Sequence, residues 1–231
     1  MTALVADALE RVKLPAMKAP SFAFFGVLAL AGVACNNDPA KGKTQAAVTE
    51  AAATPPPQTP QAPANGANYV FSQAGSTVEF VGAKVTKKHD GKVGSFSGVV
   101  QLIENDPLKS SVRVQLDLDS LSVDEAKLAK HLKSPDFFDV ARFPKASFQS
   151  TAIKAGGENS ATHTVTGNLD LHGVTKQISF PARIKVNAEQ VSVEAEFAIN
   201  RKDFGINYPG MADDLIKDDV LILLKLDAKK S

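Results

Sequence analysis

The chain has 231 residues, of which 26 are basic and 25 acidic, so its formal net charge is +1. This balance, without a long basic run, excludes the electrostatic footprint of a nucleic-acid-binding protein. The single cysteine excludes an internal disulfide, and the length allows one large domain or two small ones.

The first 35 residues have the layout of a secretory signal. Lys13 and Lys18 precede an apolar run over residues 22–34, and Cys35 follows it. The run is shorter than the roughly 18 residues that a membrane-spanning helix needs. We interpret residues 1–35 as a signal region, with Met17 as an alternative start because Met17 and Lys18 would begin a signal of ordinary length.

Cys35 is the informative residue of this region, because a lone cysteine in an exported chain has no internal partner. Bacterial lipoproteins are cleaved directly before a cysteine that is then acylated, and Ala34 fits that pattern, whereas Gly32 stands where leucine is usual. We expect lipidation of Cys35, with cleavage by the ordinary signal peptidase as the alternative. Lipidation predicts a protein that is secreted across the inner membrane and anchored to a membrane in the periplasm.

The next segment, residues 36–68, is rich in Ala, Thr, Pro, Gln and Asn and contains three consecutive prolines from Pro55. A segment with so few large apolar residues cannot form a core, so it is predicted to be a disordered linker. As a flexible coil it would span roughly 30 Å, which lets a folded domain stand off the membrane.

Period-two alternation of apolar and polar residues dominates the remaining domain, residues 69–231. It is cleanest where Val112, Val114, Leu116 and Leu118 face one way and the residues between them face the other. Clear or weaker alternation predicts about seven further strands and one short extra candidate, at residues 77–86, 92–104, 146–155, 161–171, 178–186, 191–199, 220–226 and 69–71.

The connections between these strands are short and turn-like, as at residues 172–173 and 187–190. Such turns join antiparallel neighbours, because a parallel crossover needs a dozen or more residues. An eight-stranded antiparallel sheet with one apolar face buries that face by closing as a barrel or by folding into a sandwich. Strands of about 10 to 13 residues favour a tall barrel.

A short helix is expected to interrupt the strands over residues 123–133 and to cap one end of the β structure. Ser122 and Glu125 have the spacing of a capping box, and Leu128 and Leu132 share one helix face. Four phenylalanines follow the helix, and two interpretations stay open for them, closure of the core and a gate for a ligand. They are Phe137, Phe138, Phe143 and Phe148.

The segments His131–Val140 and Arg142–Thr151, which hold these phenylalanines, resemble the YceI-like family of bacterial secreted proteins. Gly167–Lys176, with its His-Gly turn, and Ile199–Ile206, with its Asn-Arg-x-Asp-Phe-Gly pattern, are similar to further motifs of that family. The chain departs from many members by carrying Gly75-Ser76 where they have His-Ser. The resemblance implies an all-β, eight-stranded antiparallel lipocalin-like barrel that encloses a polyisoprenoid or similar long-chain lipid.

The inward side chains are mostly aliphatic or aromatic, which suits contact with hydrocarbon, although a barrel packed solid by its own side chains is the alternative. Strand parity and the aromatic segment give the predicted ligand-binding residues. They are Val112, Val114, Leu116, Leu118, Phe137, Phe138, Phe143, Phe148, Val193, Phe197 and Ile199.

No metal site or catalytic residue is predicted, because the histidines and acidic residues lack metal-ligand spacing and the serines lack a nucleophile-elbow context. Arg201 and Asp203 are expected to pair and pin a strand end. The predicted function is non-catalytic binding, sequestration or transport of a long isoprenoid-type lipid in the cell envelope, without a cofactor. Two alternatives stay open, a structural or protein-interaction barrel with a filled interior and an envelope enzyme acting on a lipid.

Overall fold

The computed structural model describes residues 38–53 and 66–231. The predicted signal region, Met17, Cys35 and the three prolines from Pro55 lie outside these residues. In the described part, no helix is long and apolar enough to cross a membrane.

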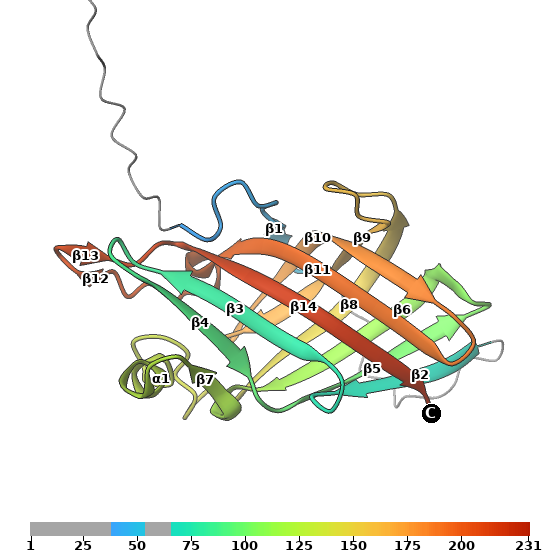
Figure 1. Cartoon of the computed structure of the whole chain (residues 1–231), viewed down its shortest axis with the longest axis horizontal. Helices are drawn as coiled ribbons and strands as arrows, with labels where there is room; N and C mark the ends of the chain where they lie inside the picture. The colour runs from blue at the N-terminus through green and yellow to red at the C-terminus, as the bar shows by residue number, and fades with distance from the viewer. Residues whose placement is uncertain (1–37, 54–65) are drawn as a thin grey trace, which may run out of the picture. The chain divides into compact units, whose positions relative to one another are not determined.

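Strands dominate the described residues (Figure 1), which also form one short α-helix, α1 (Ala126–Leu132), and two 3-10 turns, η1 (Leu118–Ser120) and η2 (Arg201–Phe204). The strands are β1 (Ala47–Glu50), β2 (Gly66–Ser72), β3 (Thr77–Ala83), β4 (Lys88–Val93), β5 (Phe96–Ile103), β6 (Asp106–Asp117), β7 (Leu121–Val123), β8 (Lys145–Ala155), β9 (His163–Leu171), β10 (Val174–Val186), β11 (Gln190–Asn200), β12 (Gly210–Met211), β13 (Asp214–Leu215) and β14 (Asp219–Lys230).

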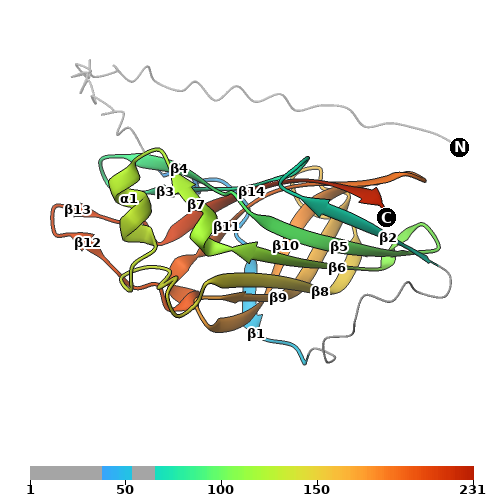
Figure 2. The ribbon, with the colours of Figure 1, turned by 90° about the horizontal axis from the view of Figure 1, so that it is seen from below.

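The long strands close into an eight-stranded antiparallel barrel in chain order (Figures 1 and 2). The first wall position holds β2 and then β3, the second β4 and then β5, and the third β6 and the short β7. The strands β8, β9, β10, β11 and β14 follow singly. The barrel closes where β14 pairs with both parts of the first position, at Lys229↔Val70 and Leu223↔Glu79. This arrangement confirms the predicted all-β barrel and rules out the sandwich.

Two tight turns show how the sequence sets the strand order. Glu104 and Asn105 join β5 to β6 with φ angles of 53° and 57°, and His172 and Gly173 join β9 to β10 with φ angles of 55° and 73°. Two consecutive residues with positive φ form the turn whose twist matches that of the flanking strands. The His-Gly pair is therefore the turn that the sequence predicted.

The helix is shorter than predicted and begins without the predicted capping box. Ser122 belongs to β7 and pairs with Lys92, so it is not a helix cap, and Glu125 is the N-cap without a side-chain capping bond. The Glu125 carboxylate instead binds Lys87. The helix lies at one end of the barrel, as predicted, and none of its residues is buried (Figure 1).

The predicted disordered linker is partly wrong, because residues 38–53 are docked on the barrel and β2 begins at Gly66. We call residues 38–53 the strap. Its strand β1 pairs antiparallel with β10, from Ala47↔Ser179 to Glu50↔Lys176. Composition misleads here because strand pairing uses backbone groups, which a chain poor in large apolar residues possesses as fully as any other.

Candidate functional site: an apolar cavity inside the barrel

The barrel contains a cavity of about 230 Å³, and its lining comes from all eight wall positions. Glu79, Ser110 and Arg201 border it, but no polar atom of the described residues contributes to its surface. Apolar cavities stay dry and accept apolar guests. The interior is therefore not packed solid by its own side chains.

Nine of the eleven side chains that the sequence predicted as ligand-binding lie on this cavity. Alternation along β6 and β11 places six of them on the inner face, since successive side chains of a strand point to opposite faces. Leu118 lies in η1, Phe138 in the loop after α1 and Phe148 on β8. The nine are Val112, Val114, Leu116, Leu118, Phe138, Phe148, Val193, Phe197 and Ile199.

Phe137 and Phe143, the other two, do not line the cavity. The Phe137 ring packs against His131 and Tyr208, with ring centroids 5.0 and 5.2 Å away. The Phe143 ring lies 5.0 Å from that of His172 and covers the turn at Gly173. Both rings close the structure at the end where β9 turns into β10, so of the four phenylalanines only Phe138 and Phe148 are placed to touch a guest.

The prediction missed three other phenylalanines that line the cavity, Phe71, Phe80 and Phe180. Phe71 and Phe80 belong to the first wall position, where alternation is weak and interrupted between β2 and β3. Phe180 lies on β10, whose inner face was recognised but not assigned to the site. Gly98 and Gly91, which lie opposite Phe71 and Phe80 on the neighbouring strands, were a signal for these two rings. Only the register between the strands connects each glycine to its ring.

Three inward rings lie over a glycine of the adjacent strand. Phe71 is opposite Gly98, Phe80 is opposite Gly91, and Phe148 covers Gly167. A Cβ atom at any of these glycines would overlap the ring. Because the glycines leave this space, the rings lie against the wall instead of projecting across the cavity.

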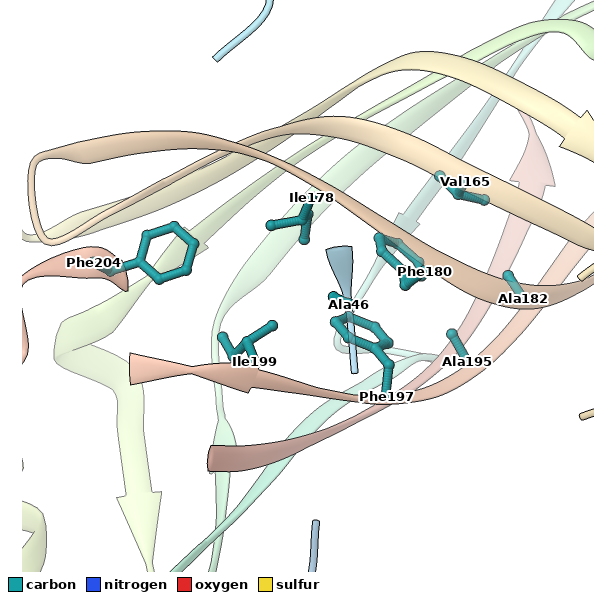
Figure 3. Close-up of a cluster of buried hydrophobic side chains, with 9 residues drawn as sticks. All are labelled: Ala46, Val165, Ile178, Phe180, Ala182, Ala195, Phe197, Ile199 and Phe204. Atoms are coloured by element: carbon teal, nitrogen blue, oxygen red, sulfur yellow. The ribbon is translucent and has the colours of Figure 1, made fainter. Parts of the chain in front are cut away.

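Phe180 and Phe197 behave differently, because they stack on each other from β10 and β11. Their ring centroids are 4.2 Å apart and their planes meet at 13°. Figure 3 shows the two rings facing each other, with Ala46 of the strap beside them. This stack marks the place where the two strands begin to separate.

Arg201 is the buried charged residue at the edge of the cavity, with 5% of its surface exposed. It donates to the carbonyl oxygens of Ile206 at 2.7 Å and Lys217 at 3.2 Å, and it pairs with Asp218 at 3.1 Å. Burial lowers the pKa of the Arg201 guanidinium and Asp218 opposes the shift. The partner is therefore Asp218 rather than the predicted Asp203, and the bonds fasten η2 to the segment before β14.

Two histidines of the described residues pair with neighbouring carboxylates at the surface rather than at the cavity. Among residues 38–53 and 66–231, no three His, Cys, Asp or Glu side chains lie close enough together to hold a metal ion. His89 bonds to Asp124 at 2.9 Å and His131 to Asp136 at 2.8 Å, both at the surface. These pairs offer structural contacts away from the cavity.

The sequence of the barrel matches a known domain family. The profile of the YceI-like domain matches residues 69–228. The chain belongs to the YceI-like family. The strap lies outside the matched residues.

Two curated relatives show the same membership. A UPF0312 protein of Pseudomonas syringae pv. syringae (strain B728a) is 33% identical over 167 residues, which cover 68% of this chain and 85% of that protein. A UPF0312 protein of Pseudomonas putida (strain W619) is 38% identical over 122 residues, which cover 50% of this chain and 62% of that protein. The second match thus spans less than two thirds of the relative's length.

Solved structures share the barrel. The crystal structure of Burkholderia cenocepacia BcnA has a TM-score of 0.60 and 23% identity, covering 69% of this chain and 99% of that chain. A polyisoprenoid binding domain from Saccharophagus degradans, implicated in plant cell wall breakdown, has a TM-score of 0.56 and 17% identity, covering 71% of this chain and 99% of that chain. Identity this low shows a shared fold.

Proposed function

We propose that this YceI-like barrel binds one long isoprenoid-type lipid in its cavity and sequesters or transports it, without catalysis. The observation that carries the proposal is the cavity of about 230 Å³ without polar surface from the described residues. Each buried methylene contributes about 0.8 kcal/mol, so a long chain binds tightly by burial alone even after the cost of ordering it. The polyisoprenoid binding domain of the same fold supports this ligand class.

The geometry also bears on the two alternatives. A structural barrel with a filled interior has no use for an open lumen, and the lumen of this protein is open. An enzyme acting on a lipid needs a reacting group beside the hydrocarbon, and Arg201 at the cavity edge already donates to two carbonyl oxygens and one carboxylate. Binding is the function that this lining supports best.

Native mass spectrometry of protein purified in mild detergent tests the proposal. The expected spectrum shows the protein plus one discrete mass, and organic extraction of the same sample releases an isoprenoid-type lipid of that mass. Protein that carries no extra mass and releases no lipid, in a sample that remains folded by circular dichroism, would refute lipid binding.

We further propose that the protein acts at a membrane of the cell envelope, held by lipidated Cys35. Only residues 36 and 37 separate this cysteine from the strap. The docked strap therefore leaves a much shorter tether than the flexible coil that the sequence suggested. The anchor predicts partition into the detergent phase that is lost in Cys35→Ala, and a variant that still partitions there would show that the acylated cysteine is not the anchor.

A further inference from the structure

The barrel wall has a lateral slot between β10 and β11. These strands pair directly over four positions, from Val186↔Val191 to Arg183↔Glu194. Beyond them the strands separate, although β10 stays paired with β9 as far as Val174 and β11 stays paired with β14 as far as Asn200. Each strand therefore presents one edge of unpaired backbone to the slot.

The strap fills this slot as an additional strand. On one side, β1 forms four register pairs with residues 176–179 of β10. On the other side, the Ala46 amide donates to the Ala198 carbonyl and the Ala198 amide donates to the Thr44 carbonyl, both at 2.8 Å. Addition of an extended peptide to exposed strand edges is a common mode of peptide recognition, and here the peptide belongs to the same chain.

The inner side of the slot faces the cavity. Ile178 and Phe180 on one edge and Phe197 and Ile199 on the other all line it. Ala46 is 7% exposed and packs in the same buried cluster (Figure 3). The strap covers this cluster from the outside with the Ala46 methyl group and part of Val48. Beneath them lie the stacked rings of Phe180 and Phe197, which must part when the strap is displaced.

The outer contacts of the strap are polar. Asn168 of β9 accepts from the Ala52 amide at 3.1 Å and donates to the Ala52 carbonyl at 2.7 Å. Two exposed ion pairs also join the strap to the barrel. Lys176 pairs with Glu50 at 2.6 Å, and Lys43 pairs with Glu196 at 2.8 Å. Asn168 is buried under the strap, but exposed ion pairs contribute little, and segments with few apolar contacts open at a lower free energy than the core.

We infer that the slot between β10 and β11 is the portal through which the lipid enters and leaves, and that the strap is its removable closure. Displacement of the strap breaks no ladder between wall strands, whereas passage through any other joint of the wall requires one to break. The inference rests on the proposed function, since a portal needs a guest. The slot lies within residues 69–228 of this chain, and its occupant comes from residues 38–53.

A disulfide that locks the strap tests the portal. Thr49 lies opposite Gln177 on the outer face, and directly paired strand residues have Cβ atoms close to disulfide range. The locked protein is Thr49→Cys with Gln177→Cys in a Cys35→Ser background, which removes the native thiol. The matched control is Ser147→Cys with Asp170→Cys, which joins β8 and β9 on the outer face away from the slot.

The measurement is the rate at which the delipidated proteins take up all-trans-retinol, a fluorescent isoprenoid alcohol, by stopped-flow fluorescence. The oxidised locked protein is expected to take it up at least tenfold more slowly than the oxidised control, and dithiothreitol should restore the rate. Equal rates in the oxidised and reduced locked protein would overturn the portal while leaving the cavity as the retinol site. Wild-type protein that binds no retinol and releases no lipid on extraction would overturn the proposed function and the portal with it.

A second variant opens the closure instead of locking it. Asn168→Ala removes both hydrogen bonds to Ala52, and Gln149→Ala truncates the outward residue opposite Asn168 on β8 as the control. Asn168→Ala is expected to speed retinol uptake at least threefold with unchanged far-ultraviolet circular dichroism. An unchanged rate in this variant contradicts a closure that must lift for entry.

Discussion

The barrel wall is built in two ways. From β2 to β9 it is a continuous series of antiparallel ladders, whose inner rings lie over glycines of the next strand. Between β10 and β11 the ladder stops after four pairs, two rings stack on each other, and a segment from outside the family domain completes the wall. The two regions present the same apolar surface to the cavity but are closed by different means. The continuous wall determines the width of the lumen, whereas the slot governs access to it.

The largest expected effect is in the continuous wall, where Leu116→Asp places a carboxylate on the apolar lining. An ionised group without a partner is strongly disfavoured in such a site, and the variant is expected to lose several kcal/mol of stability or to remain folded without lipid. Thermal unfolding and the extracted lipid content measure the two results.

Gln115→Asp is the matched control, because Gln115 is the adjacent residue on the exposed outer face of β6. It should keep both the melting temperature and the bound lipid. A folded Leu116→Asp protein that retains the same lipid as Gln115→Asp would remove Leu116 from the lining and weaken the view of this wall as the lipid-contacting surface.

The next effect concerns the glycines under the rings. Gly98→Ala puts a methyl group where the Phe71 ring lies, and overpacking of a core costs about 1–3 kcal/mol. The displaced ring can move only toward the lumen, which it then narrows. The variant should therefore bind fewer of the isoprenoids that are as long as retinol or longer. Competition binding with isoprenoid alcohols of increasing length measures the change.

Gly75→Ala serves as the control, because a Cβ atom there meets no described atom within 4 Å. The double variant Gly98→Ala with Phe71→Leu should recover most of the lost stability, since the smaller side chain vacates the space. If Gly98→Ala binds and melts like Gly75→Ala, the glycine does not determine the position of the ring.

The difference between the two regions also explains what could be predicted from the sequence. Period-two alternation predicted the strands and the inner face of β6 and β11, because parity is a local property. It left barrel and sandwich open, and strand length and the family resemblance favoured the barrel. The pairing of Phe71 with Gly98 depends on register between strands, which alternation does not specify. The strap escaped prediction because backbone hydrogen bonds hold it. Ser122 and Glu125 misled because a capping spacing also occurs at the end of a strand.

Native-state hydrogen exchange gives a third, smaller contrast between the regions. The amides of Ala46 and Ala198, which bond across the slot, should exchange through a local opening whose free energy lies a few kcal/mol below that of global unfolding. Amides of the β8 and β9 ladder, such as those around Phe148↔Leu169, should exchange near the global limit. Equal protection at both places would make the strap an integral wall strand and contradict its separate opening.

The smallest effect is a pH dependence at Asp219, at the start of β14. Burial raises the pKa of its carboxyl, the nearby charge of Asp38 in the strap raises it further, and a hydrogen bond from Gln45 opposes the shift. Asp203 and Asp218 lie near the same carboxyl and also disfavour its charge, although Asp218 is itself paired with Arg201 and Lys202.

The sign follows from proton binding. With its pKa raised above the ordinary 3.8, Asp219 binds protons more tightly in the folded protein than in the unfolded chain. Its contribution to stability therefore falls as pH rises through the raised pKa and recovers as pH is lowered. Asp219→Asn should raise the melting temperature by about 1–2 °C at pH 7, with a gain that shrinks toward pH 4.

Asp213→Asn removes a charge from the exposed loop before β14 and serves as the control. A gain in melting temperature that stays constant with pH, or that this control reproduces, would contradict the assignment to Asp219. Because Asp38 and Gln45 belong to the strap, the same substitution should slow exchange of the Ala46 amide at neutral pH, which connects this charge to the closure of the slot rather than to the continuous wall.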